Sequence, residues 1–403
     1  MPFEYHEEIE LEIKTLTNMG KGLGRTDDDW VVFVPFCLPG EQVIARIYRN
    51  EKNFSEADLV KIIIKSPERI NPRCELFGQC GGCQYQNLDY SAQLKWKGRQ
   101  LHELILHMAG MEFPVAPVIP SPIEYGYRSK ITPHFERPRN NKIDAIGFQR
   151  AGRRALIDVE ECAIAHPAIN QQLAKLRDSI RQSSGTYKKG ATLLLRVDDN
   201  NDVHTKPGLI AVDRVAGIEF QYPAGSFFQN NPAILAAFTN HVRHEASAGK
   251  ASYMIDAYCG AGLFALTAAS KFKEAVGIEI SEEAVYWAKK NAEINAVENV
   301  RFITGKVEEL FHDVSFPGGE TAVVIDPPRK GCSNDFLSQL FNLSPRTVIY
   351  VSCNPSTQMR DLLQFQKAGY GLDKVQPFDL FPQTKHIECV MTLNKSATTP
   401  HET

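Results

Sequence analysis

Hydrophobic and polar residues alternate in short runs over the first 65 residues of the chain. Ile9, Leu11 and Ile13 alternate with charged residues, and further apolar runs at 31–34 and 42–47 are separated by turns rich in Gly, Pro and Asp. Alternation of this period places the apolar side chains on one face of each strand, and short strands joined by such turns are typical of a small antiparallel barrel. We therefore expect a β-barrel over residues 1–65.

From Ser252 onward the pattern changes to apolar strands that alternate with helical segments. The apolar runs have the length of buried strands and lie at residues 253–258, 276–280, 322–325 and 348–352. Strands that are apolar on both faces and alternate with helices indicate a parallel sheet covered on both sides. The sequence predicts an α/β domain with a Rossmann-like, mostly parallel sheet over residues 223–395, followed by a disordered polar tail at 396–403.

The segment between these two parts, residues 66–222, mixes short strand-like runs with one amphipathic helix. The helix is expected within residues 89–114, where Leu101, Leu104 and Ile105 fall on one side. We expect a central α+β domain here.

Composition limits the class of protein. A chain of 403 residues is long enough for two or three domains, and its 43% hydrophobic and 23% charged residues are typical of a soluble globular protein. No run approaches the roughly 18 consecutive apolar residues of a membrane span, and the acidic first 12 residues do not resemble a signal peptide. We expect a cytoplasmic protein without a membrane, whose nine cysteines are metal ligands, nucleophiles or core residues rather than disulfides.

Three cysteines, Cys74, Cys80 and Cys83, lie within ten residues, and two glycines separate the last two. The glycines let the backbone wrap tightly, so that the sulfurs can converge on one centre. Cys162 is the best candidate for a fourth ligand. Both zinc and an iron–sulfur cluster accept four thiolates, so the spacing leaves the metal open. The alternative is a group of buried structural cysteines.

A basic segment runs from residue 128 to residue 154. It contains eight Lys or Arg residues and two acidic residues, although the whole chain has a net charge of -3. Cations that contact phosphates and interleaved aromatic rings that stack on bases are the combination that single-stranded RNA recognition uses. The candidate contacts are Arg128, Lys130, Arg150, Arg153 and Arg154. The alternative is a solvated sheet face.

A glycine turn, Cys259-Gly-Ala-Gly-Leu-Phe-Ala265, follows the first strand of the α/β domain. Gly260 and Gly262 would let a cofactor approach the backbone, and Glu279 at the end of the next strand could accept bonds from ribose hydroxyls. This arrangement fits dinucleotides and S-adenosylmethionine equally well, so the later strands must decide between the cofactors.

The later strands favour methyl transfer to carbon. The loop Asp326-Pro-Pro-Arg329 lacks the aromatic residue with which amino-group methyltransferases stack a base. Cys353 follows the next strand, and a thiolate there could add to C6 of uracil and make C5 nucleophilic, provided that nearby donors or cations lower its pKa. The alternative is a buried structural cysteine.

Two further polar residues complete the candidate chemistry. After methylation the C5 proton must leave before the thiolate can be eliminated, and a positioned carboxylate suits that step. Glu388, two residues after His386 and at the start of an apolar run, is the candidate, with an ordinary edge-strand acid as the alternative. Gln229, before a helix, could bond the methionyl part of the cofactor or the base edge.

Together these motifs resemble those of known families. The turn at 18–24 and the corner at 36–41 resemble a TRAM domain, an oligonucleotide/oligosaccharide-type barrel. The rest of the chain is similar to the RNA (uracil-5-)-methyltransferases. The resemblance rests on the cysteine set with Cys162, Ser226-Phe-Phe-Gln-Asn-Asn231, Asp326-Pro-Pro-Arg-Lys-Gly331, Ser352-Cys-Asn-Pro355 and His386-Ile-Glu388.

The resemblance implies specific roles for these residues. Cys353 would be the nucleophile and Glu388 the base, and the helix within 89–114 would pack on the catalytic domain. Leu263 stands where members often have Asn, so one cofactor hydrogen bond is expected to be absent. The implied ligands of a 4Fe-4S cluster in the central domain are Cys74, Cys80, Cys83 and Cys162, and the implied S-adenosylmethionine contacts are Gln229, Tyr258, Gly260, Gly262, Glu279 and Asp326.

The barrel and the cysteine set resemble most closely the branch that acts on 23S ribosomal RNA, and transfer RNA is the alternative substrate. We expect a monomer with no obligate protein partner. Two other functions stay open on the residues alone. One is a nicotinamide-dependent oxidoreductase that uses the glycine turn, and the other is an inactive iron–sulfur RNA-binding module.

Overall fold

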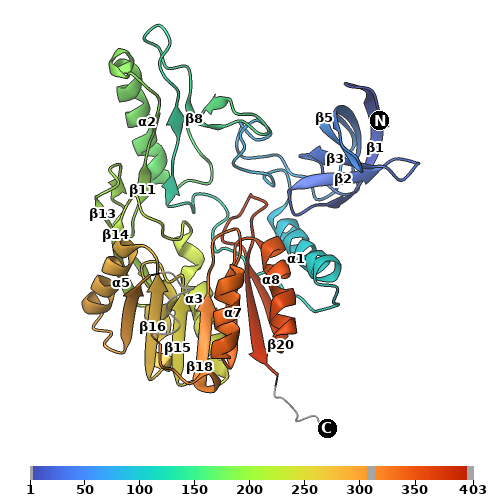
Figure 1. The fold of residues 1–403 in the computed structure, drawn as a ribbon. Coiled ribbons are helices and arrows are strands. Elements are labelled where there is room, and N and C mark those ends of the chain that lie inside the picture. The colour runs from blue at the N-terminus through green and yellow to red at the C-terminus, as the bar shows by residue number, and fades with distance from the viewer. Residues whose placement is uncertain (1–2, 306–313, 397–403) are drawn as a thin grey trace.

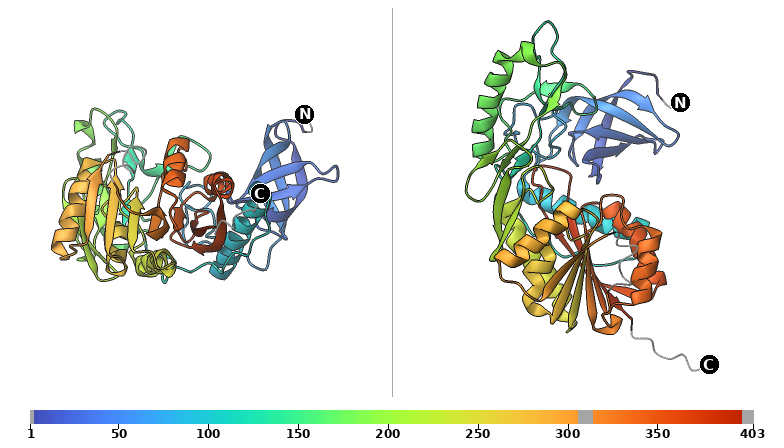
Figure 2. Two further views of the ribbon diagram at one scale, coloured as in Figure 1. Left: turned by 60° about the horizontal axis from the view of Figure 1, so that its bottom comes forward. Right: turned by 60° about the vertical axis from the view of Figure 1, so that its left-hand side comes forward.

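The computed structural model describes residues 3–305 and 314–396 (Figure 1). The predicted disordered tail lies outside the described residues, except for residue 396. The chain forms a barrel, a central part and an α/β part, and the barrel and the central part both lie above the carboxyl ends of the strands of the α/β part (Figures 1 and 2). No helix within the described ranges is long and apolar enough to cross a membrane.

The N-terminal part is a closed barrel, as the alternating pattern predicts, but it is not antiparallel throughout because β3 and β5 run parallel. Its strands are β1 (Glu8–Leu16), β2 (Lys21–Arg25), β3 (Val31–Pro35), β4 (Gln42–Asn50) and β5 (Phe54–Ile64). The inward-facing residues, among them Leu11, Ile13 and Val43, are at most 3% exposed and form one core. Alternation with period two therefore builds this barrel directly.

Helix α1 (Tyr90–Met108) joins the barrel to the α/β part. Asp89 caps its N-terminus by accepting a hydrogen bond from the backbone N–H of Ser91. One end of the helix packs against Leu16 of the barrel through Ala92 and Trp96. The other end lies against α8 (Pro355–Lys367), as Figure 1 shows.

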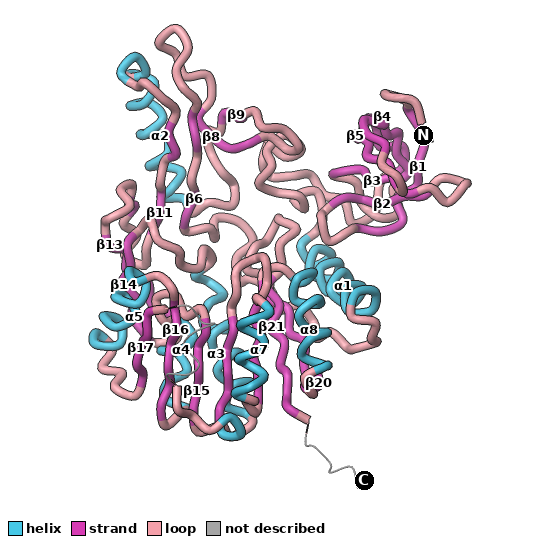
Figure 3. The backbone as a smooth tube through the Cα atoms, in the orientation of Figure 1, coloured by secondary structure: helices cyan, strands magenta, loops and turns pink. Residues whose placement is uncertain are grey.

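The central part consists of small sheets and one long helix. One sheet has the order β10-β7-β8-β9 and another the order β12-β11-β6, and α2 packs on β11 (Figure 3). The hairpin β13-β14 then leads into the α/β part. The bounds are β6 Lys130–Ile131, β7 His134–Phe135, β8 Ile146–Gln149, β9 Leu156–Asp158, α2 Pro167–Gln182, β10 Ala191–Thr192, β11 Leu195–Val197, β12 Val203–His204, β13 Ile210–Val215 and β14 Ile218–Pro223.

The α/β part contains a seven-stranded sheet of order β17-β16-β15-β18-β19-β21-β20 in the described residues. The first five strands in this order are parallel, and β21 runs antiparallel to both of its neighbours. This confirms the predicted Rossmann-like sheet. Its strands are β15 Tyr253–Ala257, β16 Glu274–Glu279, β17 Val300–Thr304, β18 Thr321–Ile325, β19 Thr347–Ser352, β20 Tyr370–Phe378 and β21 Glu388–Lys395.

Helices cover both faces of this sheet. One apolar core lies under α3 (Pro232–Ala248), α4 (Leu263–Ala268) and α5 (Glu282–Ile294), and a second lies under α1, α7 (Asn334–Leu343) and α8. Short 3-10 helices lie at Ser184–Thr186, Ala269–Lys271 and Gly318–Glu320. Every residue of β18 and β19 is buried, which explains why their sequences are apolar on both faces.

Candidate active site

The pairing of β19 with β21 brings Cys353 and Glu388 together. Ser352 at the end of β19 is opposite Cys389 in this antiparallel pair, so the next residues, Cys353 and Glu388, meet at the carboxyl edge of the sheet. The Cys353 side chain is partly exposed, whereas Glu388 is 3% exposed. A thiol that a ligand can reach and a buried carboxyl group therefore face the same edge.

The glycine turn lies two strands away, after β15. Tyr258 and Gly260 have positive φ values of 66° and 54°, and a Cβ added to Gly260 would meet no atom within 4 Å. The backbone N–H of Gly260 donates to Oε2 of Glu279 at 3.1 Å, and Ser281 donates to its Oε1 at 3.0 Å. The turn is thus fixed by Glu279 and leaves open space beside Gly260.

Gly262 and Leu263 close the turn against the core. Gly262 has φ 92°, and an added Cβ would lie 3.0 Å from the Phe302 ring. Leu263 is 8% exposed and belongs to the core under α3 to α5, so an apolar side chain fills the position where an Asn side chain would offer a hydrogen bond.

Asp326 lies between the glycine turn and Cys353 because β18 separates β15 from β19. Its backbone N–H approaches the carbonyl of Ala257 at 3.4 Å. Burial raises the pKa of the Asp326 carboxyl group to about 7. Burial also raises the pKa of Glu388 well above its usual value, and the charge of Asp326 adds to that effect. Near neutral pH the two carboxyl groups therefore hold at least one proton between them.

Cys353 is a thiol in the absence of substrate. Burial, followed by the charges of Glu388 and Asp326, raises its pKa to about 11. The guanidinium of Arg329, from the loop after β18, lies beside the thiol and partly offsets this effect. The predicted role of Cys353 needs a lowered pKa, and Arg329 is the cation that would lower it, but burial and the two carboxyl groups raise the pKa by more.

The segment before Glu388 is held in place by side chains of α1. Lys97 Nζ donates to Asp379 at 2.6 Å and to the carbonyl of Phe381 at 3.2 Å, and both members of the ion pair are fully buried. The side chains of Gln93 and Gln383 pair at 3.0 Å. These contacts fix the path of the chain that carries Glu388.

Gln229 is 8% exposed and lies between β14 and α3. The preceding loop is held by two cations, because Arg196 donates to the carbonyls of Ala224 and Ser226, and Lys130 Nζ donates to the carbonyls of Gly225 and Ser226. The ammonium group of Lys130 thus donates to backbone carbonyls close to Gln229 in the chain. Burial next to Arg196 lowers its pKa to about 8.

The other cations of the basic segment differ in their surroundings. Arg128 donates to the carbonyl of Lys130 at 3.0 Å and lines the cysteine cavity described below. Arg150 is partly exposed, and Arg153 and Arg154 are exposed in the turn between β8 and β9. These three arginines present charge to solvent, whereas Arg128 and Lys130 are directed inward.

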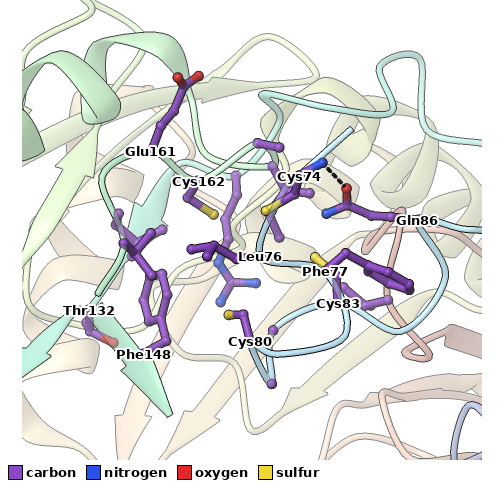
Figure 4. Close-up of a pocket in the computed structure, with 18 of the residues that line it drawn as sticks. Cys74, Leu76, Phe77, Cys80, Cys83, Gln86, Thr132, Phe148, Glu161 and Cys162 are labelled. Atoms are coloured by element: carbon purple, nitrogen blue, oxygen red, sulfur yellow. Dashed lines mark hydrogen bonds between the residues drawn. The ribbon is translucent and has the colours of Figure 1, made fainter. Parts of the chain in front are cut away.

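The four predicted ligands line one cavity of about 310 Å³ (Figure 4). In Figure 4 the sulfurs of Cys74, Cys80, Cys83 and Cys162 are turned toward the same space, whereas the carboxylate of Glu161 points away from it. Burial, together with the charges of the other three thiols, raises the pKa of Cys83 to about 12. The fold therefore brings four thiols from two distant segments within electrostatic range.

This donor set fits a thiolate-bound group, because four soft ligands face one cavity. The chemistry of these four side chains is therefore suitable, but their positions do not by themselves support the predicted 4Fe-4S cluster. Within residues 3–305 and 314–396, no group of three or more His, Cys, Asp or Glu side chains is arranged to hold a metal ion.

A second cavity, of about 250 Å³, adjoins Cys353 on the barrel side. It is lined by residues of the β1–β2 turn, of α1, of the loops after β18 and β19, and of the segment 385–387. This cavity was not predicted from the sequence because its walls come from five separate parts of the chain. The sequence does contain one signal for this cavity, a cation directly after Asp326-Pro-Pro at the end of a strand. Arg329 was interpreted only as a non-aromatic residue.

The comparisons with known proteins agree with this architecture. The TRAM domain profile matches residues 3–60, and the profile described as tRNA (Uracil-5-)-methyltransferase matches residues 206–316 and 319–396. A solved structure, Pyrococcus abyssi tRNA (uracil-54, C5)-methyltransferase in complex with S-adenosyl-L-homocysteine, has a TM-score of 0.74 at 24% identity. It aligns with 96% of this chain and 100% of that chain, which shows the same fold.

Two curated relatives match nearly the whole chain. The tRNA (uracil(54)-C(5))-methyltransferase of Schizosaccharomyces pombe is 39% identical over 98% of this chain and 80% of that protein. The protein of the same name from Saccharomyces cerevisiae is 32% identical over 97% of this chain and 74% of its own length. The chain therefore belongs to the RNA uracil-5-methyltransferase family, as an S-adenosylmethionine-dependent enzyme with an N-terminal TRAM domain.

Proposed function

We propose that this enzyme forms 5-methyluridine in transfer RNA, with Cys353 as the nucleophile and Glu388 as the base that removes the C5 proton. The observation that carries the proposal is the meeting of Cys353 and Glu388 at the sheet edge, set by the register of β19 and β21. Asp326 and the glycine turn follow along the same edge, so methyl donor and base would bind side by side.

The chemistry balances with these two residues. The Cys353 thiol gives its proton to solvent and its sulfur adds to C6 of uracil, so that the electron pair of the C5–C6 double bond becomes available at C5. That pair takes the methyl group of S-adenosylmethionine, whose S–CH3 bond breaks, and S-adenosylhomocysteine leaves. Glu388 then removes the C5 proton, the C5–C6 double bond forms again, and the S–C6 bond breaks to release Cys353.

Glu388 must lose its own proton before it can act as a base. Burial, and next the ionised form of Asp326, raise its pKa and oppose its ionisation in the empty site. A cationic ligand beside Asp326 would favour both carboxylates, since an opposite charge favours the ionised form. The proposed cofactor contacts are Gln229, Tyr258, Gly260, Gly262, Glu279 and Asp326.

Transfer RNA is proposed as the substrate in place of the 23S ribosomal RNA favoured by the sequence motifs. Two relatives that match 97–98% of this chain are named for uridine 54 of transfer RNA. The barrel with the cysteine set does not distinguish the substrates by itself.

We further propose that Cys74, Cys80, Cys83 and Cys162 hold a 4Fe-4S cluster. Support comes from the all-sulfur lining that these residues give to one cavity. The bound group would tie the loop after the barrel to the loop before α2, and no step of methyl transfer passes through it.

The test is methylation of defined transcripts. Purified protein, S-adenosylmethionine and either a transfer RNA transcript or 23S ribosomal RNA fragments are incubated, and 5-methyluridine is measured by nucleoside mass spectrometry. Methylation of transfer RNA at one uridine, lost in Cys353→Ala, is expected. Preferential methylation of the ribosomal RNA fragments would make 23S ribosomal RNA the substrate, and 5-methyluridine production by Cys353→Ala would exclude the proposed nucleophile.

A further inference from the structure

The cavity beside Cys353 extends beyond the residues that the chemistry described so far uses. Its lining includes the nucleophile Cys353 and its neighbour Arg329, and also Asn18, Met19 and Lys385, which have no role in that chemistry. Neither Glu388 nor any residue of the glycine turn lines it. The target base must contact both Cys353 and Glu388, and the cofactor must reach the glycine turn, so the part of the cavity formed by Asn18, Met19 and Lys385 is left for another part of the substrate.

The wall from the barrel is held firmly in place. Gln100 of α1 donates to the carbonyls of Leu16 and Thr17 at 3.0 and 2.9 Å, and Asn18 Nδ2 donates to Ser356 Oγ at 3.2 Å. Gly20 has φ 73°, and an added Cβ would lie 3.2 Å from Cβ of Lys385. The β1–β2 turn is thus packed against the loops around Cys353. A barrel connected to the rest of the chain only by its linker would not make these contacts.

The tip of this turn is exposed despite its rigid base. Met19 is 56% exposed, and its sulfur lies 3.8 Å from Lys385 Nζ. An unbranched thioether side chain packs adaptably against aromatic rings. A rigid turn with an adaptable apolar tip is suited to support a base that has left its stack.

The charge of the cavity favours an anion. Its cationic lining residues are Lys97, Arg329 and Lys385, and no Asp or Glu is among its lining residues. The Lys97 charge is already paired with Asp379. Within the described ranges, no carboxylate forms a salt bridge with Arg329 or Lys385. His386 also lines the cavity and is neutral, since burial lowers its pKa to about 4.

We propose that this cavity binds the nucleotide next to the target uridine, with its phosphate on Lys385 and Arg329 and its base against Met19. The inference rests on the proposed RNA methylation and adds a role for the barrel turn as a positioning element of the active site. The occupant is part of the RNA, because the cavity is lined by Cys353 and combines an apolar tip with Arg329 and Lys385, which form no salt bridge with a carboxylate of the described residues.

The test pairs a protein variant with a change in the RNA. RNA hairpins carry the target uridine and one methylphosphonate linkage, which removes the charge of a single phosphate, at successive positions around it. Wild type, Lys385→Gln and the control Lys52→Gln, an exposed residue between β4 and β5, are compared by kcat/KM and by equilibrium binding without S-adenosylmethionine.

At one linkage flanking the target, neutralising the phosphate is expected to weaken binding by wild type and by Lys52→Gln about tenfold, and to change binding by Lys385→Gln hardly at all. An abasic residue at that nucleotide should likewise weaken binding by wild type, but should change binding by Met19→Gly hardly at all. The inference would be overturned if neutralising each phosphate weakened binding by Lys385→Gln as much as it weakens binding by wild type, at every linkage. Because binding is measured without methyl transfer, this result is distinguishable from failure of the proposed reaction.

Discussion

Replacing Asp326 with Asn should stabilise the α/β part at alkaline pH while lowering activity. Asp326 lies at the end of β18, where burial raises its pKa from 3.8 to about 7. The folded state therefore binds a proton more tightly than the unfolded state. Stability falls as pH rises from about 4 to about 7, because the unfolded chain ionises first, and the loss is complete above the folded pKa.

The shift sets the size of the effect. A difference of about three pKa units at about 1.4 kcal/mol per unit corresponds to about 4 kcal/mol at pH 8. Glu388 shares the proton of this pair, so the gain from Asp326→Asn is expected at about 2–4 kcal/mol at pH 8 and below about 1 kcal/mol at pH 4. The neutral amide keeps the shape of the side chain but removes the carboxylate proposed to contact the cofactor, which is why activity should fall.

Amide hydrogen exchange of β15 and β18 measures this locally, since exchange there reports the free energy of opening the sheet. Asp373→Asn, an exposed residue of β20, is the matched control and should change little at either pH. A gain in Asp326→Asn that is equal at pH 4 and pH 8, or no gain at pH 8, would refute the raised pKa of Asp326.

Three further predictions concern the base, the basic segment and the cysteine cavity. Glu388→Gln should slow turnover by about 10²–10⁴-fold while covalent RNA adduct accumulates on denaturing gels, because the C5 proton stays in place; normal turnover would exclude the role. Replacing Arg150, Arg153 and Arg154 with Gln should weaken RNA binding and flatten its dependence on salt, and an unchanged salt slope would make this a solvated face. Protein purified without oxygen should contain iron and acid-labile sulfide that Cys162→Ser loses; equal metal content in both proteins would contradict the ligand set.

The barrel and the parallel sheet could be predicted because each follows from one local period. Ile9, Leu11 and Ile13 alternate, and the continuous apolar run that becomes β18 is buried along its whole length. The order of strands at the sheet edge was not accessible in this way. β21 inserts between β19 and β20, and only that pairing places Glu388 next to Cys353.

Side-chain surroundings were harder to predict than side-chain identity. The basic segment identified Arg128 and Lys130 by charge, but their donors turn to the carbonyls of Lys130, Gly225 and Ser226. The pattern of cations along the chain carries no signal for that direction. The cavity beside Cys353 was missed because its lining residues lie as far apart in sequence as Met19 and Lys385.

The nucleophilic role of Cys353 is tested most directly by trapping. Transfer RNA containing 5-fluorouridine at the target position is incubated with enzyme and S-adenosylmethionine, and the linked peptide is identified by mass spectrometry. A base can remove a proton from C5 but cannot remove fluorine in the same way, so the covalent adduct cannot break down. Wild type and the control variant Cys332→Ala, changed at a buried cysteine, should therefore form an adduct on Cys353 that survives denaturation. Cys353→Ala should form none. Absence of the adduct from wild type under conditions that permit methylation, or its attachment to another residue, would contradict the proposed mechanism.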